Sequence, residues 1–198
     1  MVGRFFFCIL FLSTLVGCAT TPSVSYVDAQ RSRSWQQFSN QNSQIDTFKL
    51  SGRVSVISQG ESHQVTVNWK YNPSEYSLKL TGPFHAGGAI IHKSSEGLTL
   101  SMNDETPYRA ISPETLMEQA LGWSAPVSAL RYWILGIPMP DAPFEASVDE
   151  LGQPHLMRQH GWSIIYDRFQ SGLPTRLAME SENARLKIII QKWEIDSD

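Results

Sequence analysis

The chain has 198 residues, of which 41% are hydrophobic and 18% charged, and its formal net charge is −3 at pH 7. This length suffices for one domain with an ordinary hydrophobic core. The slightly negative charge argues against nucleic acid as a partner and against binding of anionic lipid by a polybasic surface. Any membrane contact of the domain should therefore be apolar.

The N-terminal segment has the pattern of an export signal. A positive charge at Arg4 precedes an apolar run of about a dozen residues from Phe5, which is the length of a secretory signal and too short for a membrane-spanning helix. The run closes on Leu-Val-Gly-Cys at 15–18, which resembles the lipobox of bacterial lipoproteins. We therefore expect residues 1–17 to be a lipoprotein signal peptide that is removed, leaving a lipidated Cys18 as the first mature residue. The alternative is a plain signal peptide with a chance cysteine.

The two cysteines fit this interpretation. Cys8 would leave with the signal and Cys18 would be consumed by lipid, so no thiol remains for a disulfide, a metal or nucleophilic catalysis. Residue 19 is Ala rather than the Asp that favours inner-membrane retention in Gram-negative lipoproteins. The expected location is the periplasmic face of the outer membrane. Residues 18–34 are predicted to be a flexible tether that begins at the lipidated cysteine, and 35–198 to be one folded domain.

The first part of the domain reads as a helix followed by strands. Apolar spacing predicts a short helix from about Arg33 to Gln44. Apolar and polar residues then alternate with a period of two, and hairpin-length turns separate the runs. The alternating runs lie at 65–71, 76–81 and 98–102. The segment 47–110 is therefore predicted to be an antiparallel meander with one apolar face.

Two amphipathic helices interrupt the strands. Ser112-Pro113-Glu114 combines an N-cap, a first-turn proline and an acid at the positive end of the dipole, and Gly122 has the position of a helix stop. A second helix is predicted over 126–135. Strands then resume, and the last is apolar on both faces, so it should be central or covered. These strands are predicted at 145–149, 155–159, 162–166, 176–179 and 185–195.

These elements predict a mainly β fold with helices (α+β): a single incomplete antiparallel β-barrel with a helical lid over a hydrophobic cavity. A closed barrel would hide its own interior, whereas an open one needs amphipathic helices as a cover. The six Trp, six Tyr, nine Phe and six Met are consistent with such a cavity, because methionine adapts to ligands of variable shape. Simple core packing is the alternative for any of these side chains.

Groups suited to catalysis are sparse. The five histidines have no metal-ligand spacing, no Gly-x-Ser-x-Gly elbow or phosphate loop occurs, and Asp104-Glu105 lies at a turn where solvated charges are expected. The sequence predicts no enzyme, no metal site and no cofactor.

The segment Leu130–Pro138, with the sequence Leu-Arg-Tyr-Trp-Ile-Leu-Gly-Ile-Pro, resembles the LolB family of outer-membrane lipoprotein receptors. The lipobox, the pair Gly52-Arg53 and the string Thr-Gly-Pro-Phe at 81–84 accompany it in the same order, so the resemblance covers essentially the whole mature chain. Phe84 stands where some members carry Leu, and Arg53 is assigned no role.

The resemblance implies a function and its partners. The protein would accept lipoproteins from a periplasmic carrier (LolA) by binding their acyl chains in a hydrophobic cavity, and insert them into the inner leaflet of the outer membrane. Its partners would be the carrier, the lipoprotein cargo and outer-membrane phospholipid, and we expect a monomer.

The resemblance also implies site residues. Phe84 would be the apolar side chain that enters the membrane, although its ring could instead fold back onto the sheet. Trp133 could equally be a fixed core residue. The predicted cavity and lid residues are Leu116, Met117, Leu130, Trp133 and Ile134.

Two other functional classes remain open at this point. One is a lipid-anchored structural or adapter protein that binds other envelope proteins by a sheet edge. The other is a lipid-modifying hydrolase, for which the sequence offers no nucleophile.

Overall fold

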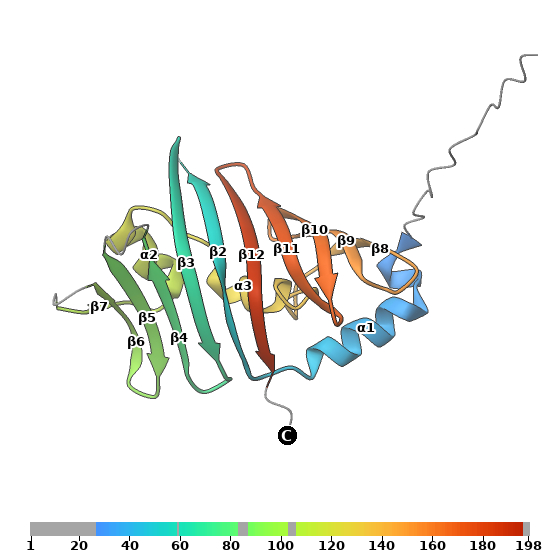
Figure 1. Ribbon diagram of the computed structural model, residues 1–198, viewed down its shortest axis with the longest axis horizontal. Coiled ribbons are helices and arrows are strands. Elements are labelled where there is room, and N and C mark those ends of the chain that lie inside the picture. Colours follow the sequence, from blue (N-terminus) through green and yellow to red (C-terminus); the bar gives the residue numbers. More distant parts are fainter. Residues whose placement is uncertain (1–26, 59, 83–86, 103–105, 196–198) are drawn as a thin grey trace, which may run out of the picture.

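The computed structural model describes residues 27–58, 60–82, 87–102 and 106–195. Within these ranges the chain forms one twelve-stranded antiparallel sheet, three α-helices and a short 3-10 helix (Figure 1). The helical elements are η1 (Ala29–Arg31), α1 (Arg33–Ser43), α2 (Pro113–Leu121) and α3 (Val127–Trp133). The strands are β1 (Val27–Asp28), β2 (Phe48–Ser58), β3 (Glu61–Tyr71), β4 (Tyr76–Thr81), β5 (Gly88–Ser94), β6 (Gly97–Met102), β7 (Tyr108–Arg109), β8 (Glu145–Val148), β9 (Pro154–Gln159), β10 (Trp162–Gln170), β11 (Leu173–Glu180) and β12 (Ala184–Ile195).

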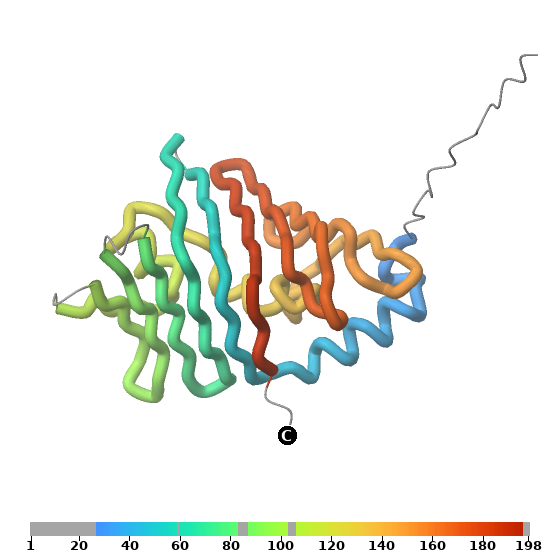
Figure 2. The backbone as a smooth tube through the Cα atoms, viewed as in Figure 1, coloured from blue at the N-terminus to red at the C-terminus, as the bar shows by residue number. Residues whose placement is uncertain are grey.

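The sheet joins two meanders through its longest strands. β2 to β7 are neighbours in chain order on one side, β8 to β12 on the other, and β12 pairs with β2 between them (Figure 2). In the described residues β1 and β7 form the two ends of the sheet and do not pair with each other. The prediction of an open antiparallel barrel is therefore confirmed, as is the central position of the last strand.

The structured part of the chain starts before the predicted boundary at residue 35. Val27 pairs with Val148, Ala29 is fully buried, and the Ser32 hydroxyl caps α1 by accepting a hydrogen bond from the Trp35 N–H at 3.1 Å. A two-residue strand and one 3-10 turn are too short to leave a periodic pattern in the sequence. The remainder of the predicted tether, with Cys18, lies outside the described residues.

Helices α2 and α3 lie across one face of the sheet, behind it in the view of Figure 1. α2 begins and ends as predicted: the Ser112 hydroxyl accepts from the Thr115 N–H at 3.1 Å, and Gly122 adopts a φ of 72°. α3 is shorter than the predicted 126–135. After Trp133 the chain tightens into a turn, in which the Gly136 N–H donates to the Trp133 carbonyl.

Helix α1 holds the end of α3 against the second meander. Phe38 contacts the Phe169 ring edge-on, at 6.0 Å between centroids. The buried Asn42 side chain donates to the carbonyls of Leu135 at 2.7 Å and Gly172 at 3.2 Å. The segment after α3 is thus tied to both α1 and the β10–β11 turn.

Gly52 marks a close approach of β2 to β12. A Cβ at this position would lie 2.3 Å from the carbonyl oxygen of Ile189, next to the register shift between Ile190 and Lys192. We expect Gly52→Ala to lower the free energy of unfolding by about 1–3 kcal/mol because backbone must move to admit the methyl group. Urea denaturation measures this. The neighbouring Ser51→Ala should change stability by less than about 0.5 kcal/mol, and equal effects for the two variants would contradict the explanation.

Candidate functional site

An apolar pocket lies between the sheet and the helices that cover it. We call it the lid pocket. Its volume is about 50 Å³, and its walls come from β2, β3, β4 and β12 on one side and from α2, α3 and their connection on the other. It is lined by Val54, Val65, Val67, Trp69, Leu78, Leu80, Met117, Trp123, Ala125, Val127, Leu130, Leu186 and Ile188.

The structure divides the predicted cavity residues into two groups. Met117 and Leu130 line the lid pocket. Leu116, Trp133 and Ile134 do not line it and are almost fully buried in the core. The segment of α2 and α3 therefore directs some of its apolar side chains toward the pocket and packs others into the core.

Trp133 occupies a fixed position in the core. Its indole N–H donates to the side-chain oxygen of Gln159 at 2.8 Å, and its carbonyl accepts from the Tyr166 hydroxyl at 2.9 Å. Burial raises the pKa of Tyr166, so this hydroxyl stays a donor. Of the two interpretations left open for Trp133, these contacts favour the core residue.

Gln159 holds Trp133 and the loop after α3 in place, a role that the sequence did not predict. It is 3% exposed, and it also accepts from the Met139 N–H and donates to the Met139 carbonyl, each at 2.8 Å. The loop after α3 is thereby bound to β9. A glutamine in an alternating strand carries no signal of this role, since its partners Trp133 and Met139 lie 26 and 20 positions away in the chain.

The lid pocket is too small for acyl chains in the arrangement observed. Ligand pockets usually have volumes of roughly 300–1,000 Å³, whereas this one has about 50 Å³. The side chains of α2 and α3 fill the space instead, as expected for close-packed protein interiors. The structure therefore does not show the hydrophobic cavity predicted from the sequence; it shows a small apolar pocket beneath α2 and α3.

Polar contacts join the two lid helices. The Glu114 carboxylate of α2 accepts from the backbone N–H of Ser128 at 2.8 Å and from its hydroxyl at 3.2 Å. Glu114 therefore caps the start of α3, and displacement of one helix alone would break both hydrogen bonds.

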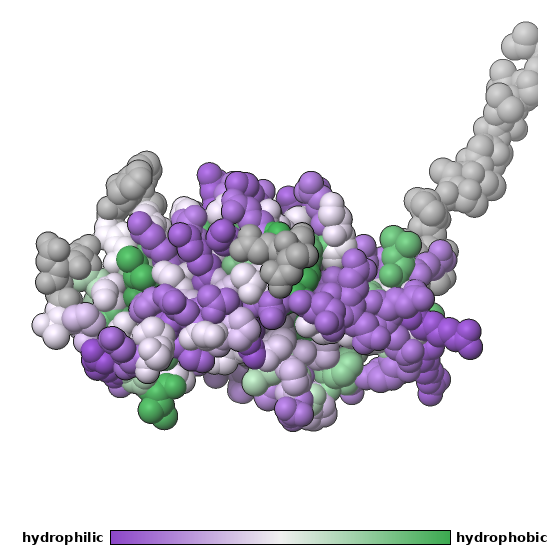
Figure 3. All heavy atoms as spheres, turned by 90° about the horizontal axis from the view of Figure 1, so that it is seen from below, coloured by the Kyte–Doolittle hydropathy of each residue, from purple (hydrophilic) through white to green (hydrophobic). Residues whose placement is uncertain are grey.

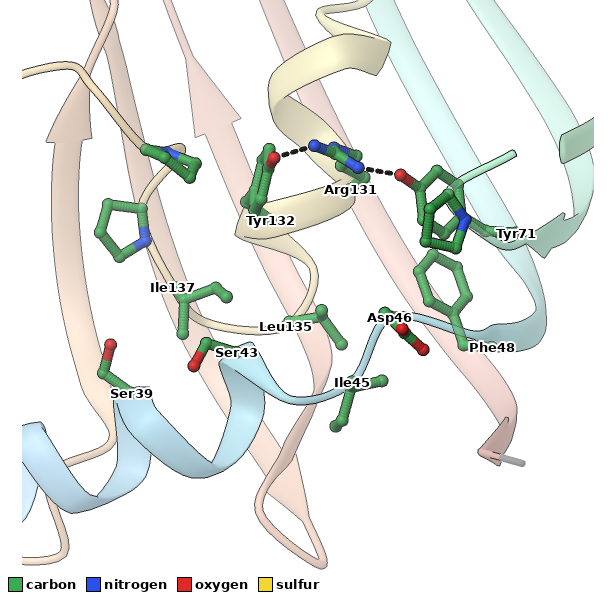
Figure 4. Close-up of a pocket in the computed structure, with 13 residues that line it drawn as sticks. Ser39, Ser43, Ile45, Asp46, Phe48, Tyr71, Arg131, Tyr132, Leu135 and Ile137 are labelled. Atoms are coloured by element: carbon green, nitrogen blue, oxygen red, sulfur yellow. Dashed lines mark hydrogen bonds between the residues drawn. The ribbon is translucent and has the colours of Figure 1, made fainter. Parts of the chain in front are cut away.

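A second pocket, the Arg131 pocket, opens at the other end of α3 and has a volume of about 250 Å³ (Figure 4). The Arg131 guanidinium donates to the hydroxyls of Tyr71 on β3 and Tyr132 on α3. Among the described residues no carboxylate forms an ion pair with Arg131, and burial lowers its pKa. The hydrogen bond from Arg131 to Tyr71 connects helix α3 to strand β3 of the sheet. The pocket is lined by Ser39, Ser43, Ile45, Asp46, Phe48, Tyr71, Pro73, Arg131, Tyr132, Leu135, Ile137, Pro138 and Pro140.

An aromatic cluster contributes residues to the walls of both pockets. Tyr71 stacks on Phe48 at 5.2 Å and on Tyr76 at 5.9 Å, and Trp69 meets Phe48 edge-on at 5.5 Å. Burial, with the nearby charge of Glu114, raises the pKa of Tyr76 to about 12. These ring contacts stabilise the cluster beyond the burial of its apolar area.

The surface at the lower end of the molecule is mainly hydrophilic, with hydrophobic residues in separate patches (Figure 3). Among the described residues, none of the helices combines the length and the hydropathy that crossing a bilayer requires.

The family described as outer membrane lipoprotein LolB matches residues 46–193. This chain belongs to the LolB family. The outer-membrane lipoprotein LolB of Chromohalobacter salexigens is 33% identical over 196 residues, covering 96% of this chain and 90% of the relative. LolB of Pseudomonas aeruginosa is 30% identical over 196 residues, covering 96% of each chain.

The solved structure of a LolA superfamily protein from Nitrosomonas europaea has the same fold, with a TM-score of 0.50 at 12% identity. The match covers 82% of this chain and 94% of that chain. The range that matches LolB contains every residue that lines the lid pocket and ten of the thirteen that line the Arg131 pocket. It also contains Phe84, whose position lies outside the described residues.

Proposed function

We propose that this LolB-family protein accepts lipoproteins from a LolA-type carrier and delivers them to the inner leaflet of the outer membrane, holding their acyl chains between the sheet and the lid helices. The observation that carries the proposal is the wholly apolar lid pocket beneath α2 and α3 on an open sheet. Family membership supports the outer-membrane location and the role in lipoprotein transport rather than catalysis.

The physical need for such a receiver follows from the cost of exposing lipid to water. Each buried methylene is worth about 0.8 kcal/mol, so two or three long chains cannot cross water uncovered. A receiver without an energy source has to offer the chains a better environment than the carrier does. In the proposed role the lid moves outward, and Met117 and Leu130 exchange contacts with β-strand residues for contacts with acyl chains.

The anchor and the insertion residue complete the proposal. Cys18 carries the lipid that keeps the domain at the membrane, and Phe84 enters the leaflet when cargo is released. Leu116, Trp133 and Ile134 keep the lid helices in shape while the pocket is occupied.

The acceptance step should not require the anchor. We expect the mature chain with Cys18→Ala to take lipoprotein from a loaded carrier at close to the normal extent, because the apolar site is built by the domain itself. Mixing the two proteins and following the lipoprotein by affinity pull-down measures this. A folded Cys18→Ala protein that leaves all cargo on the carrier would contradict the proposal.

The adapter alternative finds little support in the sheet edges. In the described part of the chain the two end strands, β1 and β7, have two residues each. Such short edges offer few free backbone groups for pairing with another protein.

A further inference from the structure

One residue that lines the lid pocket carries a buried hydrogen-bond donor that has no acceptor among the described residues. Trp69 on β3 lines the pocket and is 2% exposed, and its indole N–H has no partner among the described residues. Buried donors are nearly always paired in proteins, since leaving one unpaired costs the full price of its desolvation. An unpaired donor beside an apolar pocket therefore calls for an explanation.

Two other indoles of the protein have acceptors. Trp133 donates to Gln159 at 2.8 Å, and Trp193 donates to the Pro174 carbonyl at 2.9 Å. The Trp69 ring is also held by its neighbours, edge-on to Phe48 at 5.5 Å and to Tyr71 at 6.1 Å. These contacts favour the ring position seen in the structure.

The rest of the pocket wall offers almost no competing polar group. Apart from Trp69 and Trp123, every residue that lines the pocket is Val, Leu, Ile, Ala or Met, and none of these side chains has an N–H or O–H. A ligand that suits this wall has long apolar chains and a polar group that accepts a hydrogen bond without donating one. A hydroxyl or a charged head would leave its own polar atoms unpaired.

We propose that the indole N–H of Trp69 recognises the carbonyl oxygen at the head of an acyl chain, in an ester or an amide linkage. This inference rests on the proposed function and names the polar contact of that same site. When the lid opens and a chain enters, the carbonyl supplies the acceptor that Trp69 lacks, while the methylenes take the places of the lid side chains. Trp69 would then distinguish acyl chains from alkyl chains of equal length.

Two lipids that differ only at the carbonyl test this. The mature Cys18→Ala chain is titrated with dipalmitoylglycerol and with its dialkyl ether analogue of equal chain length, each displacing a fluorescent fatty-acid probe. We expect the ester to bind about fivefold more tightly, which is the contribution of one typical net hydrogen bond. In Trp69→Phe, which keeps an aromatic ring but loses the donor, the ratio of the two affinities should fall to about one.

Trp193→Phe is the matched control, because Trp193 does not line the lid pocket and its indole N–H already donates to the Pro174 carbonyl. It should keep the ester preference. If the wild-type chain binds both lipids equally, or if Trp69→Phe keeps the preference, the role of Trp69 is wrong while the proposed function stands. If the wild-type chain binds neither lipid, the proposed function itself fails.

A measurement on the unmutated side chain covers the case in which Trp69→Phe does not fold. Nuclear magnetic resonance of the indole N–H groups should show one buried resonance moving downfield with the ester and staying in place with the ether. No such difference between the two lipids would overturn the assignment.

Discussion

Phe84→Glu should leave folding and acceptance of lipoprotein intact and stop delivery to the membrane. The segment that holds Phe84 joins β4 to β5, whose last pair next to it is Thr81 with Gly88. A phenylalanine at the bilayer interface contributes about 1.5–3 kcal/mol, which is enough to direct this end of the hairpin to lipid. A carboxylate loses that contribution and also resists leaving water. Transfer of labelled lipoprotein from the loaded protein into liposomes should fall by roughly tenfold or more.

Phe84→Leu is the control for this effect, because leucine is also large and apolar. It should retain most of the transfer rate. Transfer at the normal rate by Phe84→Glu would show that this side chain has no part in delivery, and loss of acceptance together with transfer would place it in the binding site instead.

Leu130→Glu should abolish acceptance itself. Leu130 lines the lid pocket from α3 and is only partly buried, so the substitution places a carboxylate in the proposed acyl path with a limited cost to the core. An unpaired charge in apolar surroundings is strongly unfavourable, so occupancy by acyl chains would compete with hydration of the carboxylate. Capture of lipoprotein from the carrier should fall by roughly tenfold or more, as measured by pull-down after mixing.

Two matched variants separate this effect from changes in fold or surface charge. Leu130→Met conserves volume and polarity and should accept cargo normally. Gln119→Glu adds the same charge to an exposed position of α2 and should also be neutral. Normal capture by a folded Leu130→Glu protein would mean that acyl chains do not pass beneath α3.

Much of the fold was predictable because its signals are local. The alternation along β3 and β4 reflects burial of one face, and Ser112 and Gly122 mark the ends of α2 by their hydrogen bonding and backbone freedom. The apolar stripes of α2 and α3 within a β-rich chain predicted a helical cover, and the string Leu130–Pro138 pointed to the LolB family, as the comparison confirmed.

The parts that were not predictable depend on residues distant in sequence. The side chain of Asn42 donates to the carbonyls of Leu135 and Gly172, which are distant in the sequence. Gln159 also binds Trp133 through a contact that no local sequence pattern predicts. The short strand at Val27 likewise exists only because β8 is present to pair with it.

The sequence alone determined that this is a β-rich domain with two amphipathic helices, and its string Leu-Val-Gly-Cys at 15–18 resembles a lipobox. Periodicity, helix caps and motifs are local features, so they can be recognised in the sequence without knowing which residues become neighbours in space. Only the tertiary structure decided that helices α2 and α3 pack onto the sheet and leave a pocket of about 50 Å³, and that Trp133 is hydrogen-bonded in the core. It also decided that the indole N–H of Trp69 has no acceptor among the described residues. Packing volume and hydrogen-bond partners are properties of side chains brought together from different strands and helices, and folding alone assembles them.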